Sequence, residues 1–283
     1  MDRTAFFAAL RGRACTLFGA ALSQGQVDTL GAILDEAVST PLPVSHVAYC
    51  MATAYHEVGQ ALKPVRENLT YTSASRIRAV WPSRFKSDAA AAPYVRQPQK
   101  LANLVYGGRL GNTAPNDGWT YRGGGLPQTT GKDGYRKVGQ MIGVDLAADP
   151  ERILEPRLAV AALVLGARFG IYTGRKLSDY LPGDYVGARA IINGDVKANG
   201  EKVAGYARQF EAALTAAGYA EAPLSPPSPP PTAPVAPPPA EPAPAKPQPM
   251  PQQNLGPQPD LGPQPEQRAW QAILATILAL FKR

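Results

Sequence analysis

Residues 44–57, VSHVAYCMATAYHE, form an almost unbroken apolar run that ends in a histidine and a glutamate, and they predict an apolar helix. Two other segments repeat apolar residues at the spacing of an amphipathic helix, at positions 27–34 after Ser23 and at positions 203–214. The sequence therefore predicts a mostly α fold class. Further candidate helices are at 97–106, 133–142, 155–169 and 185–192.

Strand signals are weak along the whole chain. Two stretches are rich in glycine, YGGRLGN at 106–112 and YRGGG at 121–125. Because closely spaced glycines favour turns with positive φ over regular structure, we expect loops or short hairpin arms there. The helical domain should therefore contain only a small β element.

A change in composition divides the chain. Most of its 30 prolines fall between Pro223 and Pro265, where almost no aromatic or β-branched residue is available to build a core. We expect one folded domain at 1–222, in which about half of the residues are apolar and a single core needs neither disulfide nor metal. Residues 223–266 are predicted to be a disordered, polyproline-like linker that ends in the hexapeptides LGPQPD and LGPQPE.

Residues 267–283 are predicted to form a C-terminal amphipathic helix. Its apolar run is too short to span a bilayer at about 1.5 Å per residue. With basic residues at both ends, we expect it to lie on an anionic membrane or outer-membrane surface. Self-association, docking on a partner protein and docking on the folded domain are the alternatives. The apolar stripe consists of Trp270, Ile273, Leu274, Ile277, Leu278 and Phe281.

The formal charge is +7, and the residues before Pro223 carry nearly all of it. This charge favours a polyanionic partner or merely aids solubility. No Lys/Arg-rich run or nucleic-acid signature is present, so no nucleic-acid partner is expected. Cys15 and Cys50 are expected to be buried free thiols. No signal peptide and no spanning helix are predicted, since the N-terminal apolar run ends before Arg11.

Two glutamates stand close in the sequence. Glu57 closes the apolar helical run, and Glu67 follows ten residues later, past Gly59 and Pro64, which should break the helix. Two carboxylates on different elements can face each other across a substrate, one protonated in apolar surroundings and the other ionised. Acid-catalysed glycoside cleavage requires such a pair. Most glutamates are solvated surface charges, so the pair needs support from other motifs.

The spacing around His56 excludes a metalloprotease-type zinc helix. That motif needs a second histidine four residues later, where this chain has Gln60. His46 is the only other histidine, and no cysteine cluster supplies replacement ligands. We therefore expect no metal site and interpret His56 as a hydrogen-bonded orienting residue or a core residue.

Four segments resemble, in order, glycoside hydrolase family 19, and within it most closely the phage-type endolysins. They are ATAYHEVGQALKPVRENLTY (52–71), LANLVYGGRLGN (101–112), DGWTYRGGGLPQTTGKDGYRKVGQMIGVDLAADP (117–150) and ARAIINGDVKANGEKVAGYARQFEAAL (188–214). The resemblance covers about residues 3–216. It implies a lysozyme-like or chitinase-like α-rich fold and an inverting mechanism on β-1,4-linked N-acetylhexosamine polymers. It also implies that no cofactor is needed.

The resemblance implies roles for the residues that match the family's motifs. The general acid, the glutamate of a helical His-Glu motif, is Glu57, and the general base falls on Glu67. For the other polar residues, a structural hydrogen bond inside a loop is the alternative. The implied water- and sugar-binding residues are Gln128, Thr130 and Asn193, with Thr72 as a weaker candidate and Tyr121, Arg122 and Trp119 as stacking or polar partners.

Two positions depart from the family's pattern. The family usually has arginine where Gly124 stands, and many members have asparagine where Gly134 precedes Tyr135. Each departure removes a side chain that could form an ion pair or contact a sugar.

The expected activity is that of an endolysin-type muramidase, a lysozyme-like hydrolase that cleaves β-1,4 bonds of bacterial peptidoglycan and lyses the cell wall. An inverting mechanism requires the two carboxyl groups to lie roughly 6.5–9.5 Å apart. The alternatives are a chitinase or a non-catalytic wall-binding protein. We expect a monomer that is made in the cytoplasm and acts at the wall, in the periplasm, after release through a holin.

Overall fold

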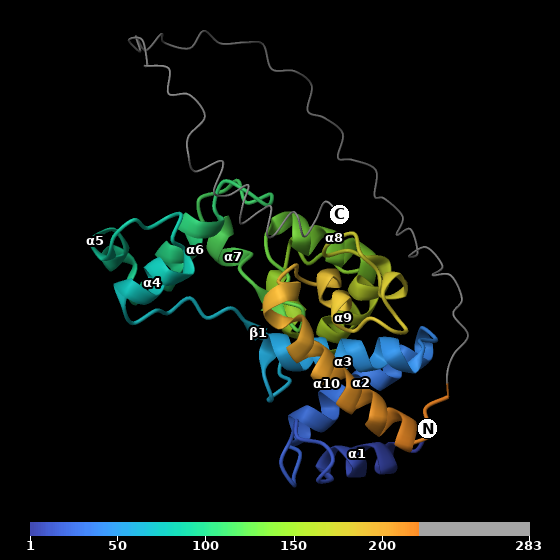
Figure 1. Cartoon of the computed structure of the whole chain (residues 1–283). Coiled ribbons are helices and arrows are strands. Elements are labelled where there is room, and N and C mark those ends of the chain that lie inside the picture. The colour runs from blue at the N-terminus through green and yellow to red at the C-terminus, as the bar shows by residue number, and fades with distance from the viewer. Residues whose placement is uncertain (221–283) are drawn as a thin grey trace, which may run out of the picture.

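The computed structural model describes residues 1–220, and most of them are helical (Figure 1). This confirms the predicted mostly α fold class with a small β element. The predicted linker at 223–266 and C-terminal helix at 267–283 lie outside the described residues. Within residues 1–220, no helix is long and apolar enough to cross a membrane.

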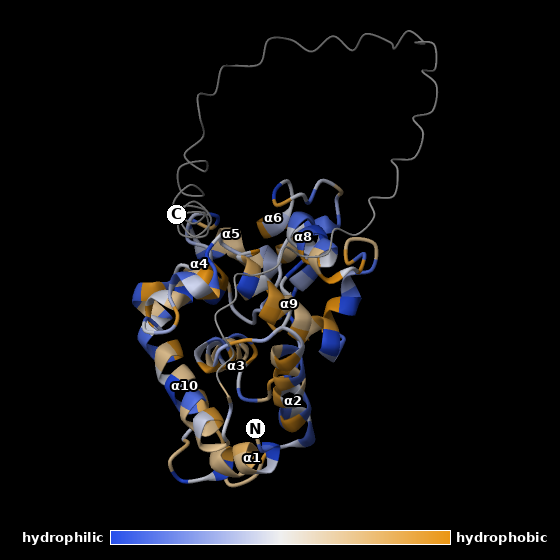
Figure 2. Ribbon diagram, turned by 90° about the vertical axis from the view of Figure 1, so that its right-hand side faces the viewer, coloured by the Kyte–Doolittle hydropathy of each residue, from blue (hydrophilic) through white to orange (hydrophobic). Residues whose placement is uncertain are grey.

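Helix α3 (Val44–Val58) lies at the centre of the larger of two apolar clusters, and every residue from 44 to 54 is buried. It packs mainly against α10 (Val196–Ala216) and also contacts α2 (Gln24–Ser39) and α9 (Pro156–Phe169). Figure 2 shows α3 between α10 and α2, with α9 beside it. A central position explains why this run carries apolar residues on every face.

The helix boundaries around α3 follow from local chemistry. At the start of α2, Ser23 and Gln26 form a reciprocal capping box: the Ser23 hydroxyl accepts from the Gln26 N–H, and the Gln26 side chain accepts from the Ser23 N–H. At the C-terminal end of α3, the next residue, Gly59, has a φ of +74°, which glycine adopts without strain. The helix therefore stops just after Glu57.

The β element is a two-stranded antiparallel pair. Strand β1 (Val65–Arg66) pairs with β2 (Gly124–Gly125), with Val65 opposite Gly125 and Arg66 opposite Gly124. A further bridge joins Gly124 to Thr129. The glycines at 123–125 therefore form a hairpin arm, one of the two structures expected for them, and they bring the strand that leads into Glu67 against the loop that carries Gln128.

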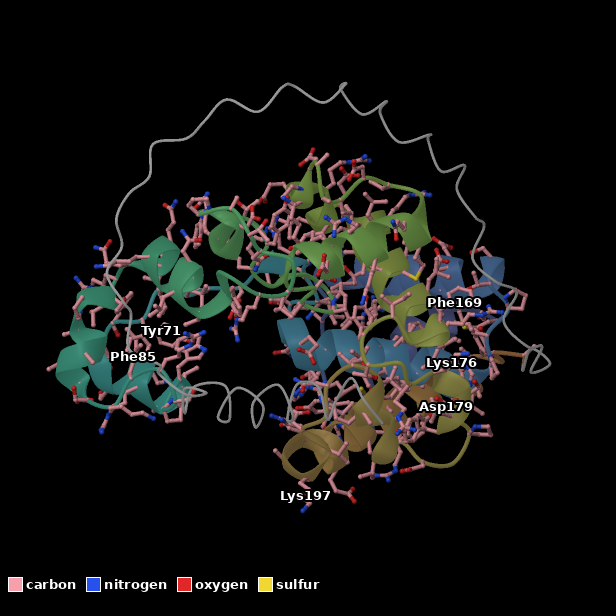
Figure 3. The ribbon with its side chains drawn as sticks, turned by 90° about the horizontal axis from the view of Figure 1, so that it is seen from above. Tyr71, Phe85, Phe169, Lys176, Asp179 and Lys197 are labelled. Atoms are coloured by element: carbon pink, nitrogen blue, oxygen red, sulfur yellow. The ribbon has the colours of Figure 1, made fainter. Side chains whose placement is uncertain are left out.

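A second, smaller apolar cluster is formed by α4 (Ala74–Val80), α5 (Asp88–Ala91) and α6 (Pro98–Tyr106). These helices are set apart from the α3 bundle in Figure 1. In Figure 3, Tyr71 and Phe85 lie together in this part, away from Phe169 and Asp179. Its buried residues are Leu69, Ile77, Trp81, Phe85, Ala91, Leu101, Ala102 and Val105.

The other helices complete the part of the chain that the structure describes. Helix α1 (Arg3–Arg11) packs on α10, α7 (Asp117–Thr120) on α6, and α8 (Lys132–Ile142) on α9. Short 3-10 helices are η1 (Ala92–Tyr94), η2 (Pro150–Leu154), η3 (Leu177–Asp179) and η4 (Gly187–Ile191).

One predicted helix is largely replaced by irregular chain. The segment 185–192 contains only the 3-10 helix η4. Its first turn is held by the Asp184 side chain, which accepts from the Gly187 N–H, and Asn193-Gly194 follows directly. Turn-forming residues therefore bound the segment on both sides and compete with a regular helix for its backbone groups.

Both cysteines are buried free thiols, as predicted. Burial raises the pKa of Cys50 to about 12. Its thiol is therefore neutral and unreactive in the folded domain.

Candidate active site

Glu57 lies in the last turn of α3, and its side chain is 15% exposed. Its Oε1 accepts a hydrogen bond of 2.5 Å from Nη1 of Arg189, whose side chain is only 2% exposed. The two residues are 132 positions apart in the chain. A buried guanidinium therefore faces the first glutamate of the predicted pair.

Arg189 is shared with a second carboxylate. Its Nε donates to Oδ1 of Asp195 at 2.6 Å, and its Nη2 donates to Oδ2 of the same residue at 3.3 Å. Asn199 also donates to Asp195, at 2.7 Å. Burial raises the pKa of Asp195, but the hydrogen bonds and charge of Arg189 outweigh it and hold that pKa below its usual value. One guanidinium thus bridges Glu57 and an ionised Asp195.

Neither Arg189 nor Asp195 stands out from the sequence as a functional residue. A signal was present, since Arg189 interrupts the apolar run of residues 188–192, and a charge in such a run is buried only with a partner. Asp195 follows six residues later, at the start of α10. Their common partner, Glu57, lies on another element and could not be inferred from spacing.

His56 precedes Glu57 and is half-buried beside the ring of Tyr206. Burial and the charge of Arg189 lower the pKa of the His56 imidazole. Among residues 1–220, no group of three His, Cys, Asp or Glu side chains could hold a metal ion.

Glu67 follows β1 and lies between the two apolar clusters. The hydroxyl of Tyr106 donates to its carboxylate, at 2.8 Å from Oε1 and 3.0 Å from Oε2. The Gly123 N–H donates to Oε2 at 3.2 Å. Burial raises the pKa of Glu67, while Tyr106, Gly123 and the charge of Arg122 act against this shift. This carboxyl therefore accepts a proton more readily than an ordinary glutamate.

Gln128 lies beside Glu67, on the other side of Gly123. A Cβ at Gly123 would lie 2.8 Å from Gln128 Oε1 and 3.1 Å from Glu67 Cβ, so the absence of a side chain there lets these two residues approach each other closely. Gln128 donates from Nε2 to the carbonyls of Val65 and Gly125. Its φ of +55° is rare for a residue other than glycine. The β element therefore brings these two predicted site residues together.

Thr130 is linked to the surroundings of Glu67, and Asn193 to those of Glu57. Thr130 donates its hydroxyl to the Gln128 carbonyl at 3.0 Å, so it supports the loop next to Glu67. Asn193 follows η4, and its N–H donates to the carbonyl of Arg189 at 3.0 Å. Thr130 thus belongs to the Glu67 side and Asn193 to the Glu57 side.

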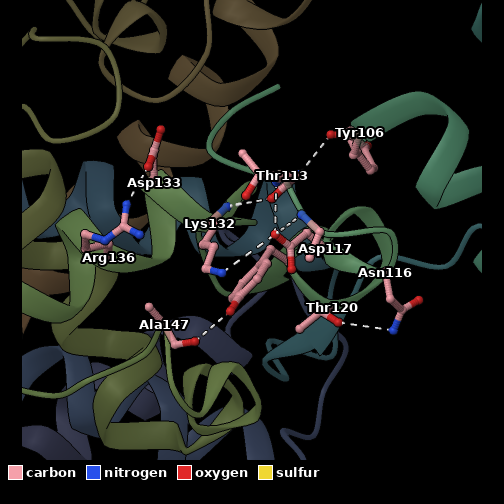
Figure 4. A network of polar contacts seen from close by, with 12 residues as sticks. Tyr106, Thr113, Asn116, Asp117, Thr120, Lys132, Asp133, Arg136 and Ala147 are labelled. Atoms are coloured by element: carbon pink, nitrogen blue, oxygen red, sulfur yellow. Dashed lines mark hydrogen bonds and ion pairs between the residues drawn. The ribbon is translucent and has the colours of Figure 1, made fainter. Parts of the chain in front are cut away.

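The remaining candidates are placed less favourably for substrate binding. Thr72 is exposed in the loop between β1 and α4. Tyr121 is only 5% exposed, and its hydroxyl donates to the carbonyl of Ala147 at 2.6 Å (Figure 4). Tyr121 therefore packs in the larger apolar cluster and uses its hydroxyl inside the domain. The Trp119 ring is covered by the Arg122 guanidinium, 3.6 Å from the ring centroid.

Close packing explains why a side chain is missing at position 124. A Cβ there would collide with the Tyr135 hydroxyl and would lie 3.0 Å from both Arg66 Nη1 and Ile153 Cγ2. Arg66 itself donates to the Tyr135 hydroxyl and pairs with Glu151. The Arg66 guanidinium thus occupies the space that a side chain at position 124 would need.

Comparison with known proteins gives one result on function. The chain is similar to a glycosyl hydrolase family 19 domain-containing protein of Haemophilus influenzae, with 36% identity over 108 residues. The aligned region is 38% of this chain and 52% of that protein, so the chain spans about half the length of this curated relative. No family model matches the chain. The resemblance to phage-type endolysins stays a prediction, whereas the similarity to a protein with a family 19 glycosyl hydrolase domain supports glycoside hydrolase chemistry in general.

Proposed function

We propose that the chain is a family 19-type glycoside hydrolase that cleaves β-1,4 bonds of bacterial peptidoglycan with inversion, as an endolysin-type muramidase. The observation that carries the proposal is the contrast between two recessed glutamates. Glu57 faces the buried Arg189, whereas Glu67 is enclosed by Tyr106 and Gly123. A mechanism with two carboxyl groups needs such separate environments. The similarity to the Haemophilus protein supports the reaction class.

In the proposed mechanism, Glu57 donates a proton to the glycosidic oxygen as the bond from that oxygen to the anomeric carbon breaks. Glu67 accepts a proton from a water molecule whose oxygen bonds to the anomeric carbon from the opposite face. Gln128, next to Glu67, is proposed to hold this water or the sugar, with Thr130 supporting its loop. Asn193 is proposed to bind substrate on the Glu57 side, and Thr72 is a further candidate.

The surroundings of the two glutamates also provide a basis for the opposite assignment, in which Glu67 is the acid and Glu57 is the base. Burial raises the pKa of Glu67, a shift that would also suit an acid, whereas Glu57 pairs with the buried Arg189. Arg189 also pairs with Asp195, so its charge is shared between two carboxylates. We assign the acid role to Glu57 because it ends the helical His-Glu motif.

Azide rescue separates the two assignments. Azide can replace the activated water when the base is missing, so Glu67→Ala should regain turnover with azide and form a glycosyl azide of inverted configuration. Glu57→Ala should not respond to azide, but should cleave aryl glycosides with good leaving groups, which need no acid. The opposite pattern would exchange the roles, and a trapped covalent glycosyl-enzyme would contradict inversion.

Peptidoglycan is favoured over chitin by the resemblance to lysins and by the positive charge of the folded domain. Mass spectrometry of fragments released from purified peptidoglycan identifies the bond that is cut. Muramic acid at the new reducing end is expected, whereas glucosamine there would indicate a glucosaminidase. Cleavage of chitin oligomers alone would indicate a chitinase. Binding without any release, with Glu57→Gln indistinguishable from the unmodified chain, would indicate a wall-binding protein.

We further propose that the protein acts as a monomer at the cell wall, in the periplasm, and reaches it after release through a holin. Bacteria that produce the chain with and without a pore-forming holin provide the test. Lysis should depend on the holin, and equally rapid lysis without it would contradict this route.

A further inference from the structure

Tyr106 is the last residue of α6 and belongs to the second apolar cluster. Its hydroxyl reaches the carboxylate of Glu67, which is 39 positions away in the chain. The other donor to this carboxylate is the N–H of Gly123, which lies between Tyr121 and Leu126 of the larger cluster. The two clusters therefore each supply one neutral donor to Glu67.

The hydrogen bonds around Glu67 distinguish its two carboxylate oxygens. A phenol has a single proton, and the Tyr106 oxygen lies almost equally far from Oε1 and Oε2, at 2.8 and 3.0 Å. Oε2 also accepts from Gly123, so among the described residues it has one donor more than Oε1. Oε1 is therefore the oxygen with more capacity left to accept a further hydrogen bond.

The position of Tyr106 is itself fixed by a buried side chain. Asn112, which is fully buried, donates from Nδ2 to the Tyr106 carbonyl at 2.9 Å. Its Oδ1 accepts from the N–H of Lys132, the first residue of α8, at 2.9 Å. This network, seen in Figure 4, ties the end of α6 to a helix that packs on the larger cluster. Packing of the ring in the second cluster and the hydrogen bond to the Tyr106 carbonyl therefore both fix the position of the phenol.

We propose that Tyr106 is a positioning residue that holds Glu67 so that Oε1 accepts the proton of the attacking water. This inference rests on the proposed function, in which Glu67 is the general base. Burial and the neighbouring Glu67 raise the pKa of Tyr106 well above its ordinary value, so the phenol stays protonated and remains a donor. A permanent neutral donor fixes the carboxylate and favours its charged form.

The substitution Tyr106→Phe removes the hydroxyl and keeps the ring in the second cluster. We expect kcat to fall by about tenfold or more, with KM nearly unchanged, because the loss affects the base and not the binding of sugar. The acidic limb of the pH profile of kcat/KM should move to higher pH by about one unit, because a hydrogen bond to the charged form is lost. Tyr94→Phe, in the same cluster and packed on Phe85, is the matched control and should change neither quantity.

Incorporation of 3-fluorotyrosine at position 106 tests the same proposal with the hydroxyl retained. Its phenol is a stronger donor, so the acidic limb should move to lower pH, opposite to the shift in Tyr106→Phe. A merely structural role for Tyr106 would give no pair of opposite shifts. Two unchanged pH profiles would overturn the inference, whether or not either protein is less stable.

Glu67→Gln, measured in parallel, separates this inference from the proposed function. If Glu67→Gln is inactive and the Tyr106 variants keep the unmodified pH profile, only the role of Tyr106 is refuted. If Glu67→Gln remains fully active, Glu67 is not the base, and the proposed mechanism fails together with the inference.

Discussion

Asp195 shares the Arg189 guanidinium with Glu57, and this sharing sets how much positive charge acts on the proposed acid. In Asp195→Asn, the buried Arg189 would lose its second charged partner and be held by Glu57 alone. Because a guanidinium that loses one of its two carboxylates no longer fixes the other in place, kcat should fall by about tenfold, with a smaller change in KM. Steady-state kinetics measure this. Asp179→Asn, in η3, is the control and should leave kcat unchanged.

The residues of the site differ in how far the sequence could predict them. Glu57, Glu67 and Gln128 stand in recognisable local motifs, and the structure places the last two side by side. Tyr106 and Arg189 matter through contacts made across 39 and 132 positions. Such contacts arise only when the chain folds, so no local spacing predicts them.

At the level of elements, the β1–β2 pair depends on the absence of a side chain at Gly124. In Gly124→Ala, the new methyl would meet the Tyr135 hydroxyl, Arg66 and Ile153. We expect a loss of about 1–3 kcal/mol in the free energy of unfolding, together with reduced activity, because this strand pair holds the chain next to Glu67. Urea unfolding measures the first effect.

Gly134→Ala provides the matched control, because this glycine lies inside α8 and a Cβ there would meet only Thr129 Cγ2, at an ordinary 3.6 Å. Alanine loses less backbone entropy on folding, so the free energy of unfolding should rise by about 0.5–1 kcal/mol. Equal effects of the two substitutions would contradict the packing argument at Gly124.

Long periodic segments were predicted well, and short ones were not. The apolar run at 44–57 and the repeats at 27–34 and 203–214 correspond to α3, α2 and α10. Helices α4 and α5 were not predicted, since seven and four residues are too few to show a periodic pattern. The segment at 185–192 has apolar residues but lies between turn-forming residues, and it holds only a 3-10 helix.

At the scale of the whole molecule, the burial of His46 predicts how the free energy of unfolding depends on pH. Burial lowers the pKa of His46 to about 4, and its Nε2 is buried without a hydrogen-bond partner. The unfolded chain binds a proton near pH 6.5, whereas the folded chain does so only near pH 4. The contribution of neutral His46 to the free energy of unfolding is therefore fully present above about pH 6.5 and is lost as pH falls towards 4, by up to about 3 kcal/mol.

The comparison that isolates this effect is urea unfolding of the unmodified chain and of His46→Gln between pH 4 and 7. Other titrating groups, including Glu67 and Asp195, are present in both proteins and cancel in the difference. The difference in unfolding free energy should shrink or reverse towards pH 4. A constant difference would show that His46 does not carry the acid sensitivity.

The C-terminal tail concerns the whole molecule too, because the sequence predicts a separation of tasks between residues 1–222 and residues 267–283. The site described above lies entirely within residues 1–220, so a chain ending at Ala222 should keep its activity on solubilised peptidoglycan. It should lose binding to anionic lipid vesicles and the killing of intact Gram-negative cells. Apolar side chains that bury at a lipid boundary contribute on the order of 1.5–3 kcal/mol each when fully desolvated, and less when half inserted.

Two basic residues at the end of the tail, Lys282 and Arg283, would add roughly 1 kcal/mol each near an anionic surface. Co-sedimentation with anionic vesicles compares the full chain, the chain ending at Ala222, and Leu274→Lys. The Lys substitution interrupts the apolar stripe without shortening the chain, so it should reduce vesicle binding to near the level of the truncated protein while hydrolysis stays unchanged. Equal binding by all three would contradict a membrane-binding role for the tail and would favour self-association or docking on a protein.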